Sequence, residues 1–463
     1  MSRAELAVVG ERVLLGDELV PATVFVEAGR IAAVRRGADR EVDAERVFDA
    51  GDDVVSPGFV DLHVHFDNPG DDLAADYRIG TANAALGGCT FVIEHPFTTP
   101  PTTTAARYAA KSELGAHGAI VDFGLWGALT GPGLGELGGQ RELGAPGFKA
   151  FLPENDMDYP SASDDDLRQG LAETARHGGL VLVHAEDREG LSAAIAAERA
   201  AGRTDYGAAL AARSPELELE AVRRVLEIAE KTGGAVHFVH LSLPAAVDLV
   251  TAARERGVAA SCEVTAHHLL LDAEDFLRLG WTALCAPPLR ARPEVEGMWQ
   301  RLRDGAIDAV VSDHCVYSVA DKAVAEHDAL GGPFGIQSAR EFAPLFLDEA
   351  LRRGWALPEA LALVTSRPAE RCGAAPAKGR IAPGADADLA VLQLGEPRPV
   401  QASGQFGPHR WSPYEGRPST VRVRATVARG EFVVLDGGLV TDHGPGAFVP
   451  LAIPAPAPAK SSA

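Results

Sequence analysis

The sequence predicts an α/β protein, namely a (β/α)₈ barrel (TIM barrel) with a small β-sandwich domain formed by N- and C-terminal segments. Eight short apolar runs alternate with helical segments through the middle of the chain, which is typical of parallel strands connected by helices. Residues 5–56 and the region after about 378 read instead as short alternating strands joined by glycine turns. A length of 463 residues suits a barrel with an accessory domain.

These two sequence patterns give the expected domain limits. We expect a composite β domain over 1–56 and 378–450, in which the two segments pair with one another, and a barrel over 57–377. Residues 451–463 are rich in proline, alanine and serine, and this composition predicts a disordered tail.

The barrel strands can be assigned one by one. In chain order they are predicted at 59–65, 90–94, 120–126, 148–151, 180–184, 236–240, 259–264 and 307–313. The clearest connecting helix is predicted over 215–232, with Ser214 as N-cap, proline at its first position and glycines 233–234 at its end. Active sites of such barrels lie at the C-terminal ends of the strands, so the residues that end each run are the first candidates for function.

Composition excludes several classes of partner. The formal net charge of −22 and the lack of any basic run argue against a nucleic-acid surface. The five cysteines show no metal-type spacing and occupy mostly apolar surroundings, which favours reduced thiols. No signal-peptide core is evident, and no apolar run approaches the roughly 20 residues that span a bilayer. We therefore expect a soluble cytoplasmic protein with neither nucleic-acid nor membrane partners.

Ionisable residues end several of the predicted strands. His63 and His65 are two residues apart, so their side chains point to the same face of the first strand. His184, His240 and Asp313 end the fifth, sixth and eighth strands. Each could be a structural residue by itself, but five such residues would converge on one barrel mouth. Imidazole and carboxylate ligands suit zinc, and also iron, manganese or cobalt.

Lys149 lies in the apolar segment "GFKAFL" of the fourth predicted strand. A buried ammonium costs several kcal/mol unless it is paired, and the simplest alternative is a side chain that extends to solvent. If Lys149 instead reacts with carbon dioxide, it becomes an anionic carbamate able to bridge two cations. One metal would then have His63, His65, the carbamate and Asp313 as ligands, and the other would have the carbamate, His184 and His240. Phe148 and Ala150 would face the helices.

The chain resembles the cyclic amidohydrolase branch of the amidohydrolase superfamily, which includes allantoinase, dihydropyrimidinase/hydantoinase and dihydroorotase. The resemblance covers nearly the whole chain, through "SPGFVDLHVHFDNPG", "GFKAFL", "LVHAED", "HFVHLS", "CEVTAHHLLLD", "CAPPLR", "VVSDHC" and "KGRIAPGADADL". All six ligand positions of the family carry the expected residue type. The resemblance implies a hydrolase of cyclic amides with two divalent ions, zinc first among them, and a homo-oligomer, dimer or tetramer.

The resemblance is strongest to allantoinase, particularly in "DALGGPFGIQ" and "HRWSPYEGRPS". Asp67 stands where dihydroorotase-like enzymes carry a carboxylate-binding arginine, which disfavours an acidic substrate. Asn155 lies where dihydropyrimidinases carry a tyrosine. The family's usual place for substrate contacts is the backbone of Cys285 and Ala286. We therefore expect substrate contacts at Asp67, Asn155, Cys285 and Ala286, and a neutral ring such as allantoin.

The expected reaction is hydrolysis of the ring C–N bond, with Asp313 as the catalytic residue that moves a proton from the attacking hydroxide to the leaving nitrogen. Cys285 as a nucleophile is an alternative, but no histidine partner is marked for it. His267 or His268 could line the pocket or be structural. The second most favoured function is that of a dihydropyrimidinase/hydantoinase, and the third is that of a dihydroorotase. An exocyclic deaminase, or a non-enzymatic dihydropyrimidinase-related interaction protein, fits the complete ligand set less well.

Overall fold

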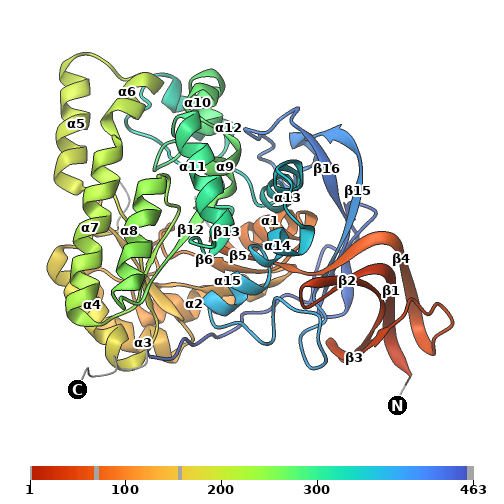
Figure 1. Ribbon diagram of the computed structural model, residues 1–463. Helices are drawn as coiled ribbons and strands as arrows, with labels where there is room; N and C mark the ends of the chain where they lie inside the picture. The colour runs from red at the N-terminus through yellow and green to blue at the C-terminus, as the bar shows by residue number, and fades with distance from the viewer. Residues whose placement is uncertain (1–2, 67–71, 155–158, 456–463) are drawn as a thin grey trace.

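The computed structural model describes residues 3–66, 72–154 and 159–455. Figure 1 shows a barrel with its surrounding helices on one side and a curved sheet on the other. In that sheet, strands from the beginning of the chain (red) lie beside strands from its end (blue).

The sheet beside the barrel has eight strands in the order β18-β17-β16-β15-β4-β1-β2-β3. They are β1 Ala4–Leu15, β2 Glu18–Glu27, β3 Arg30–Arg36, β4 Ala44–Pro57, β15 Leu389–Pro399, β16 Pro418–Ala428, β17 Glu431–Leu435 and β18 Gly438–Leu439. The two ends of the chain meet where β4 pairs antiparallel with β15, with Pro57 opposite Leu389. The predicted pairing of the two flanking segments is confirmed, whereas the exact domain limits stay a prediction.

The barrel strands follow the predicted runs closely. They are β5 Phe59–His65, β6 Cys89–Glu94, β7 Asp122–Leu125, β8 Gly127–Ala128, β9 Gly147–Phe151, β10 Leu180–His184, β11 Val236–Phe238, β12 Ala260–Thr265, β13 Ala309–Val311 and β14 His314–Cys315. Parallel pairing joins β8 through β13 in one sheet and β14, β5, β6 and β7 in another. Because only Trp126 separates β7 from β8, and only residues 312–313 separate β13 from β14, the two sheets form one ring. The predicted barrel is confirmed.

Helices connect and cover the barrel strands. They are α1 Leu73–Leu86, α2 Ala105–Ala116, α3 Leu137–Glu142, α4 Asp164–His177, α5 Arg188–Ala200, α6 Tyr206–Ala212, α7 Pro215–Thr232, α8 Pro244–Glu255, α9 Ala266–Leu270, α10 Ala273–Leu279, α11 Arg292–Arg303, α12 Val319–Ala323, α13 Phe342–Arg352, α14 Leu357–Ala362 and α15 Ser366–Arg371. Short 3₁₀ helices lie at Gly131–Glu136, Gly280–Ala283, Val324–Glu326 and Ala402–Gly404. The helix predicted over 215–232 has these bounds, with Ser214 at the N-cap and Gly233 ending it at a φ of 75°.

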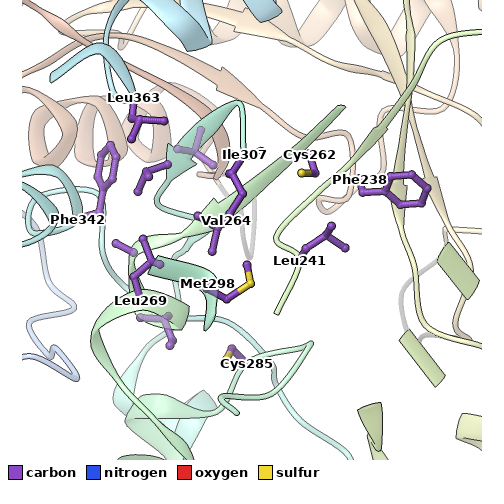
Figure 2. Packing of buried hydrophobic residues seen from close by; sticks show 14 of the residues in the cluster. Phe238, Leu241, Cys262, Val264, Leu269, Cys285, Met298, Ile307, Phe342 and Leu363 are labelled. Carbon is purple, nitrogen blue, oxygen red and sulfur yellow. The ribbon is translucent and has the colours of Figure 1, made fainter. Parts of the chain in front are cut away.

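The main apolar core lies between the barrel wall and its helices. Figure 2 shows Met298 of α11 and Leu269 of α9 near Val264 of β12. The outward-facing residues of β9, Phe148 and Ala150, belong to the same core and are fully buried. This packing fixes the strands laterally, so their carboxyl ends are held at set distances from one another.

The segment that leads to the C-terminus crosses the barrel at the amino ends of its strands. The Phe123 N–H donates to the Ala447 carbonyl, and the Leu451 N–H donates to the Gly144 carbonyl. Leu451 is buried in the apolar cluster formed by inward-facing barrel residues, and Ile453 packs against it. Leu451 and Ile453 therefore contact the barrel within the segment for which composition predicts a tail, and the limits of that tail stay a prediction.

Within the described ranges, no helix is both long and apolar enough to span a bilayer. All five cysteines are free and buried.

Candidate metal centre

The six predicted ligands surround one cavity of about 820 Å³ at the carboxyl ends of the barrel strands. They are His63, His65, Lys149, His184, His240 and Asp313. All six residues are buried in the fold. The strands therefore bring together residues that lie up to 250 positions apart in the chain.

His63, His65 and Asp313 form one half of the cluster. Asp313 Oδ1 lies 3.2 Å from His63 Nε2 and 3.6 Å from His65 Nε2. Burial alone would raise the pKa of the Asp313 carboxyl, but its contact with His65 holds that pKa below the ordinary value. Asp313 also has a φ of 47°, a left-handed backbone conformation that a non-glycine residue adopts only when its surroundings enforce it.

His184 and His240 form the other half, with ring centroids 4.6 Å apart. His184 Nε2 lies 2.7 Å from Glu186 Oε2, and the Arg213 guanidinium pairs with the same carboxylate at 2.5 Å. Nδ1 of His240 is buried and has no hydrogen-bond partner among the described residues. Like Asp313, His240 has a positive φ, here 38°. Both backbone outliers belong to the same cluster.

Hydrogen-bond acceptors determine which histidine nitrogens can bind a cation. A carboxylate or carbonyl oxygen only accepts, so the ring nitrogen that faces it carries the proton. His63 Nδ1 faces Glu263 Oε1 at 2.6 Å, and His65 Nδ1 faces the Phe97 carbonyl at 3.2 Å. Nε2 of both rings also faces a carboxylate, because Asp313 Oδ1 lies 3.2 Å from His63 Nε2 and 3.6 Å from His65 Nε2. A cation between these nitrogens and Asp313 would place the proton of each ring on Nδ1 and make Nε2 the ligand nitrogen, and the contact with Glu186 makes Nδ1 the available nitrogen of His184.

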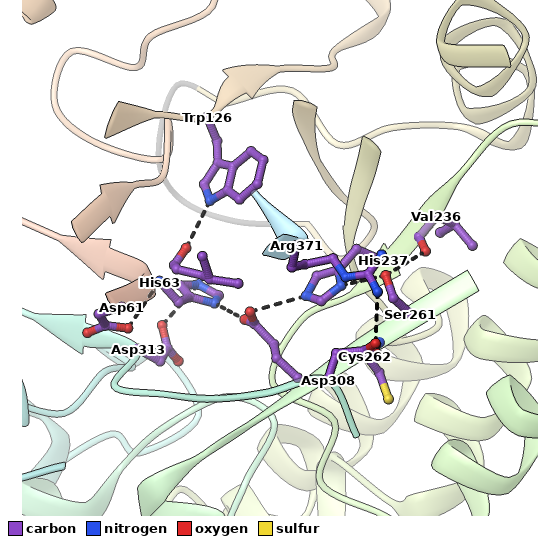
Figure 3. A network of polar contacts seen from close by, with 12 residues as sticks. Asp61, His63, Trp126, Val236, His237, Ser261, Cys262, Asp308, Asp313 and Arg371 are labelled. Carbon is purple, nitrogen blue, oxygen red and sulfur yellow. Dashed lines mark hydrogen bonds and ion pairs between the residues drawn. The ribbon is translucent and has the colours of Figure 1, made fainter. Parts of the chain in front are cut away.

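Glu263 of β12 is the centre of a polar network beneath the cavity. Its second oxygen lies 3.2 Å from His237 Nε2, and His237 Nδ1 contacts Ser261 Oγ at 2.8 Å. Figure 3 shows His63 and His237 on either side of this link, with Asp313 next to His63. Since Glu263 is completely buried, its charge is balanced mainly by the imidazole protons that it accepts. The sequence reasoning missed this residue.

Lys149 projects into the same cavity from β9. Its side chain is 1% exposed, and burial lowers the pKa of its amine to about 8. Among the described residues, no carboxylate lies within ion-pair distance of its Nζ. Its own carbonyl accepts a hydrogen bond of 2.7 Å from the Tyr159 hydroxyl, which fixes the strand at this point. The neutral amine is therefore more abundant near neutral pH than in an exposed lysine, at about a tenth of the molecules at pH 7.

His95 is a further residue of the cluster that the sequence reasoning missed. It follows β6 directly, and its ring centroid lies 3.8 Å from that of His63. Both ring nitrogens are buried without a hydrogen-bond partner among the described residues. The signal that marked the other histidines, an ionisable residue at the end of an apolar run, was present here as well.

Several groups of side chains have a geometry suited to a cation. The ligand atoms of His63, His240 and Asp313 lie within 4.8 Å of one another, as do those of His65, Asp313 and Cys315. Two further groups meet the same criterion, His267–His268–Cys285 and Asp122–Asp386–Asp388. The last group surrounds the ammonium of Lys378, and Arg429 and Arg30 pair with Asp122 and Asp386, so three cations already balance its three carboxylates. The histidine-rich donor set at the cavity fits a divalent transition metal.

The predicted substrate contacts have different positions. Ala286 lines the cavity, whereas Cys285 is buried, does not line it, and directs its thiol to the Pro287 carbonyl. Burial raises the pKa of the Cys285 thiol to about 12, which is unfavourable for a nucleophile. Asp67 and Asn155 lie outside the described residues.

His267 and His268 do not line the cavity, although both are buried. His268 contacts Thr265 Oγ1 and the Pro287 carbonyl, whereas His267 has no hydrogen-bond partner among the described residues.

Apolar and aromatic side chains form the outer part of the cavity. The rings of Phe97 and Phe151 stack with centroids 4.9 Å apart and an angle of 3° between their planes. Phe334 and Ile195 line the cavity from the loop after β14 and from α5. The polar cluster thus lies at the base, and flat apolar surfaces suitable for a planar ring lie above it.

Comparisons with known proteins agree with this arrangement. A model of the amidohydrolase family matches residues 54–433. An allantoinase from Rubrobacter xylanophilus is 38% identical over 97% of this chain and 98% of that protein, and an allantoinase from Streptomyces avermitilis is 36% identical over 96% and 98%. Among solved structures, an L-hydantoinase (dihydropyrimidinase) from Arthrobacter aurescens has a TM-score of 0.92, with 31% identity, 96% of this chain covered and 100% of that one.

Proposed function

This chain belongs to the amidohydrolase family and is an allantoinase-like enzyme, and we propose that it hydrolyses a ring C–N bond in a neutral cyclic ureide such as allantoin. The observation that carries the proposal is the convergence of four histidines, Lys149 and Asp313 on one cavity wall. The near-full-length similarity to allantoinases supports the choice of ring.

The donor set would hold two divalent cations, with zinc the first expectation. His63, His65 and Asp313 would serve one ion, and His184 and His240 the other. An acceptor on the far side of three of these rings favours the tautomer whose ligand nitrogen faces the cavity, which supports this assignment. When bound, the ions would acidify water and polarise the substrate carbonyl.

Lys149 would complete the site as a carbamate. The neutral amine attacks the carbon of carbon dioxide, a new N–C bond forms, and the proton leaves to solvent. A buried cation would thereby become an anion whose two oxygens could serve as ligands together with the histidines. The lowered pKa of the amine favours this reaction at neutral pH.

Asp313 would be the group that moves the proton. Its carboxylate is ionised near neutral pH because the contact with His65 lowers its pKa. It accepts a proton from the attacking water as the C–O bond forms, and it donates that proton to the ring nitrogen as the C–N bond breaks. The stacked pair Phe97 and Phe151 would contact one side of the ring, and the backbone at Ala286 would orient its polar edge.

A substrate panel tests the proposal. Metal-loaded protein is assayed with allantoin, hydantoin, dihydrouracil and dihydroorotate, and Asp313→Asn is the inactive control. We expect the highest kcat/KM for allantoin and none for dihydroorotate. Preference for hydantoin or dihydrouracil would favour the hydantoinase alternative, which the structural similarity to the Arthrobacter aurescens protein supports. Metal analysis should give about two ions per chain, and protein that is folded but has no affinity for metal would contradict the proposal.

We further propose that the enzyme works as a homo-oligomer in the cytosol. Five free, buried thiols are compatible with a reducing compartment. Sedimentation of the purified protein measures the assembly state, and a monomer at working concentration would contradict this part.

A further inference from the structure

A second cavity, of about 470 Å³, lies between α13 and the strands β15 and β16. Figure 1 shows α13 beside β16 at the junction of the barrel and the β-sheet. None of the residues that line this cavity also lines the first one. Any ligand of the second cavity would therefore occupy a site separate from the metal centre.

Four arginines line this second cavity, which we call the arginine pocket: Arg340, Arg398, Arg422 and Arg424. Arg424 pairs with Asp53 at 2.9 Å, and the Arg340 guanidinium donates to the Gln401 carbonyl at 3.1 Å. Arg398 and Arg422 have no ion-pair partner among the residues that the structure describes. Two guanidinium groups thus share one cavity without a carboxylate within ion-pair distance of either, although Glu341 and Asp436 also line the cavity, in a protein whose formal net charge is −22.

Arg422 has a guanidinium nitrogen that is buried without a partner among the described residues. Its Nη2 donates to Gln393 Oε1 at 2.7 Å, whereas its Nη1 is buried and has no acceptor among the described residues. Burial lowers the pKa of this guanidinium, and the nearby charge of Arg398 lowers it further. A buried charged donor without an acceptor is costly, and an anion that accepted from it would remove that cost.

The acidic residues of the pocket do not supply this anion. Asp436 is 80% exposed and lies 3.7 Å from Arg424. Glu341 is buried, and its Oε1 accepts from Gln405 at 3.2 Å. Burial raises the pKa of the Glu341 carboxyl to about 7, so near neutral pH a large fraction is uncharged and repels an incoming anion less.

We propose that the arginine pocket binds a small oxyanion with two or more negative charges, a phosphate or a dicarboxylate, held by Arg398 and Arg422. Guanidinium groups bind both classes through paired N–H donors, so the shared chemistry defines the ligand. Pro344, Leu345 and Val400 would contact any apolar part of it.

The pocket is connected to the eighth barrel strand through the start of α13. Arg340 and Glu341 follow Ser338, whose N–H donates to His314 Nδ1 at 3.0 Å and whose hydroxyl donates to the Ser312 carbonyl at 2.8 Å. Asp313 lies between these two residues. Because of this connection, hydrolytic activity is measured in the same samples as anion binding.

Calorimetric titration of the metal-loaded protein tests the proposal, at pH 7 and with ionic strength held constant by chloride. Inorganic phosphate and succinate are titrated separately, and the arm that binds more tightly identifies the ligand class. We expect saturable binding of at least one of them, weakened about tenfold in Arg422→Gln and in Arg398→Gln. Arg256→Gln is the matched control, because it removes an exposed arginine that pairs with Glu230 elsewhere on the surface.

The two pocket variants also exclude binding at the metal centre. Phosphate bound there would be retained with unchanged affinity in both variants, and that result would overturn the proposal. Absence of saturable binding for both anions would also overturn the proposal. Arg398 is exposed, so Arg398→Gln remains informative if Arg422→Gln fails to fold. Loss of binding in the pocket variants while allantoin hydrolysis persists separates this proposal from the proposed function.

Discussion

Glutamine in place of Glu263 should weaken metal binding although Glu263 is not itself a ligand. The Glu263 carboxylate accepts from His63 at 2.6 Å, so it holds the ring with its Nε2 lone pair toward Asp313. An amide keeps one acceptor oxygen at this position but loses the charge. Charge-assisted hydrogen bonds contribute about 1.5–3 kcal/mol and neutral ones about 0.5–1.5, so the loss is about 1–1.5 kcal/mol. This difference corresponds to about a tenfold weaker affinity.

Alanine at the same position removes the acceptor altogether. The His63 ring then loses its orientation, and His237 loses its contact to the same carboxylate. We expect a reduction of about 100-fold, the upper end of the range for residues that orient metal ligands. The order of affinity should therefore be wild type, then Glu263→Gln, then Glu263→Ala.

Competition between the protein and a zinc chelator of known affinity measures these constants. Asp348→Asn is the control, because Asp348 is also a buried carboxylate but interacts with Arg352 and Thr420, away from the cavity. It should reduce stability without reducing zinc affinity. Wild-type zinc affinity in Glu263→Gln would refute the reasoning, and so would an equal loss of affinity in Asp348→Asn.

Three further changes have defined outcomes. Lys149→Ala should lose bound metal and activity. Added bicarbonate or propionate, but not chloride, should restore part of the bound metal and part of the activity. Unchanged activity in this variant would exclude the carbamate. Glu341→Gln should stabilise the fold by up to about 3 kcal/mol above pH 7 and by nothing below pH 4. The folded pKa of about 7 exceeds the unfolded value of 4.5, so the unfolded chain loses its proton first and stability falls between these two values. Denaturant titrations of the wild type and the variant above pH 7 and below pH 4 check this. An equal difference in their free energy of unfolding at the two pH values would contradict it. Lys378→Met should lower the free energy of unfolding by about 3–5 kcal/mol, because three carboxylates lose their shared cation. Lys231→Met changes an exposed lysine and is the control. Equal midpoints of denaturant unfolding for the two variants would contradict the expectation.

Simple rules applied to the sequence predicted the barrel and the members of the polar cluster. A strand alternates its faces, so a charged residue that ends an apolar run must project into or over the barrel. The same rule applied to His95 would have added it to the cluster. Glu263 could have been found as Lys149 was, because it is a charge within the apolar strand β12.

Other features depend on contacts that no local pattern specifies. Lys378 meets Asp122 across 256 positions, and its sequence surroundings do not indicate this partner. Arg422 and Arg398 are close only because β15 and β16 pair in a particular register with an irregularity between Leu394 and Arg398. The contact of Leu451 with the barrel interior is likewise not indicated by the composition of residues 451–463, from which the tail was predicted.

The route of residues 447–455 across the barrel restricts how the chain reaches its final state during synthesis. β4 can pair with its neighbour β15 only after β15 has been synthesised. The amino end of the barrel remains uncovered until Leu451 has left the ribosome. These contacts therefore form only after the chain has been made through residue 451. A nascent chain stalled before 389 would expose the edge of β4 to other chains, so this order gives chaperones a defined window in which to act.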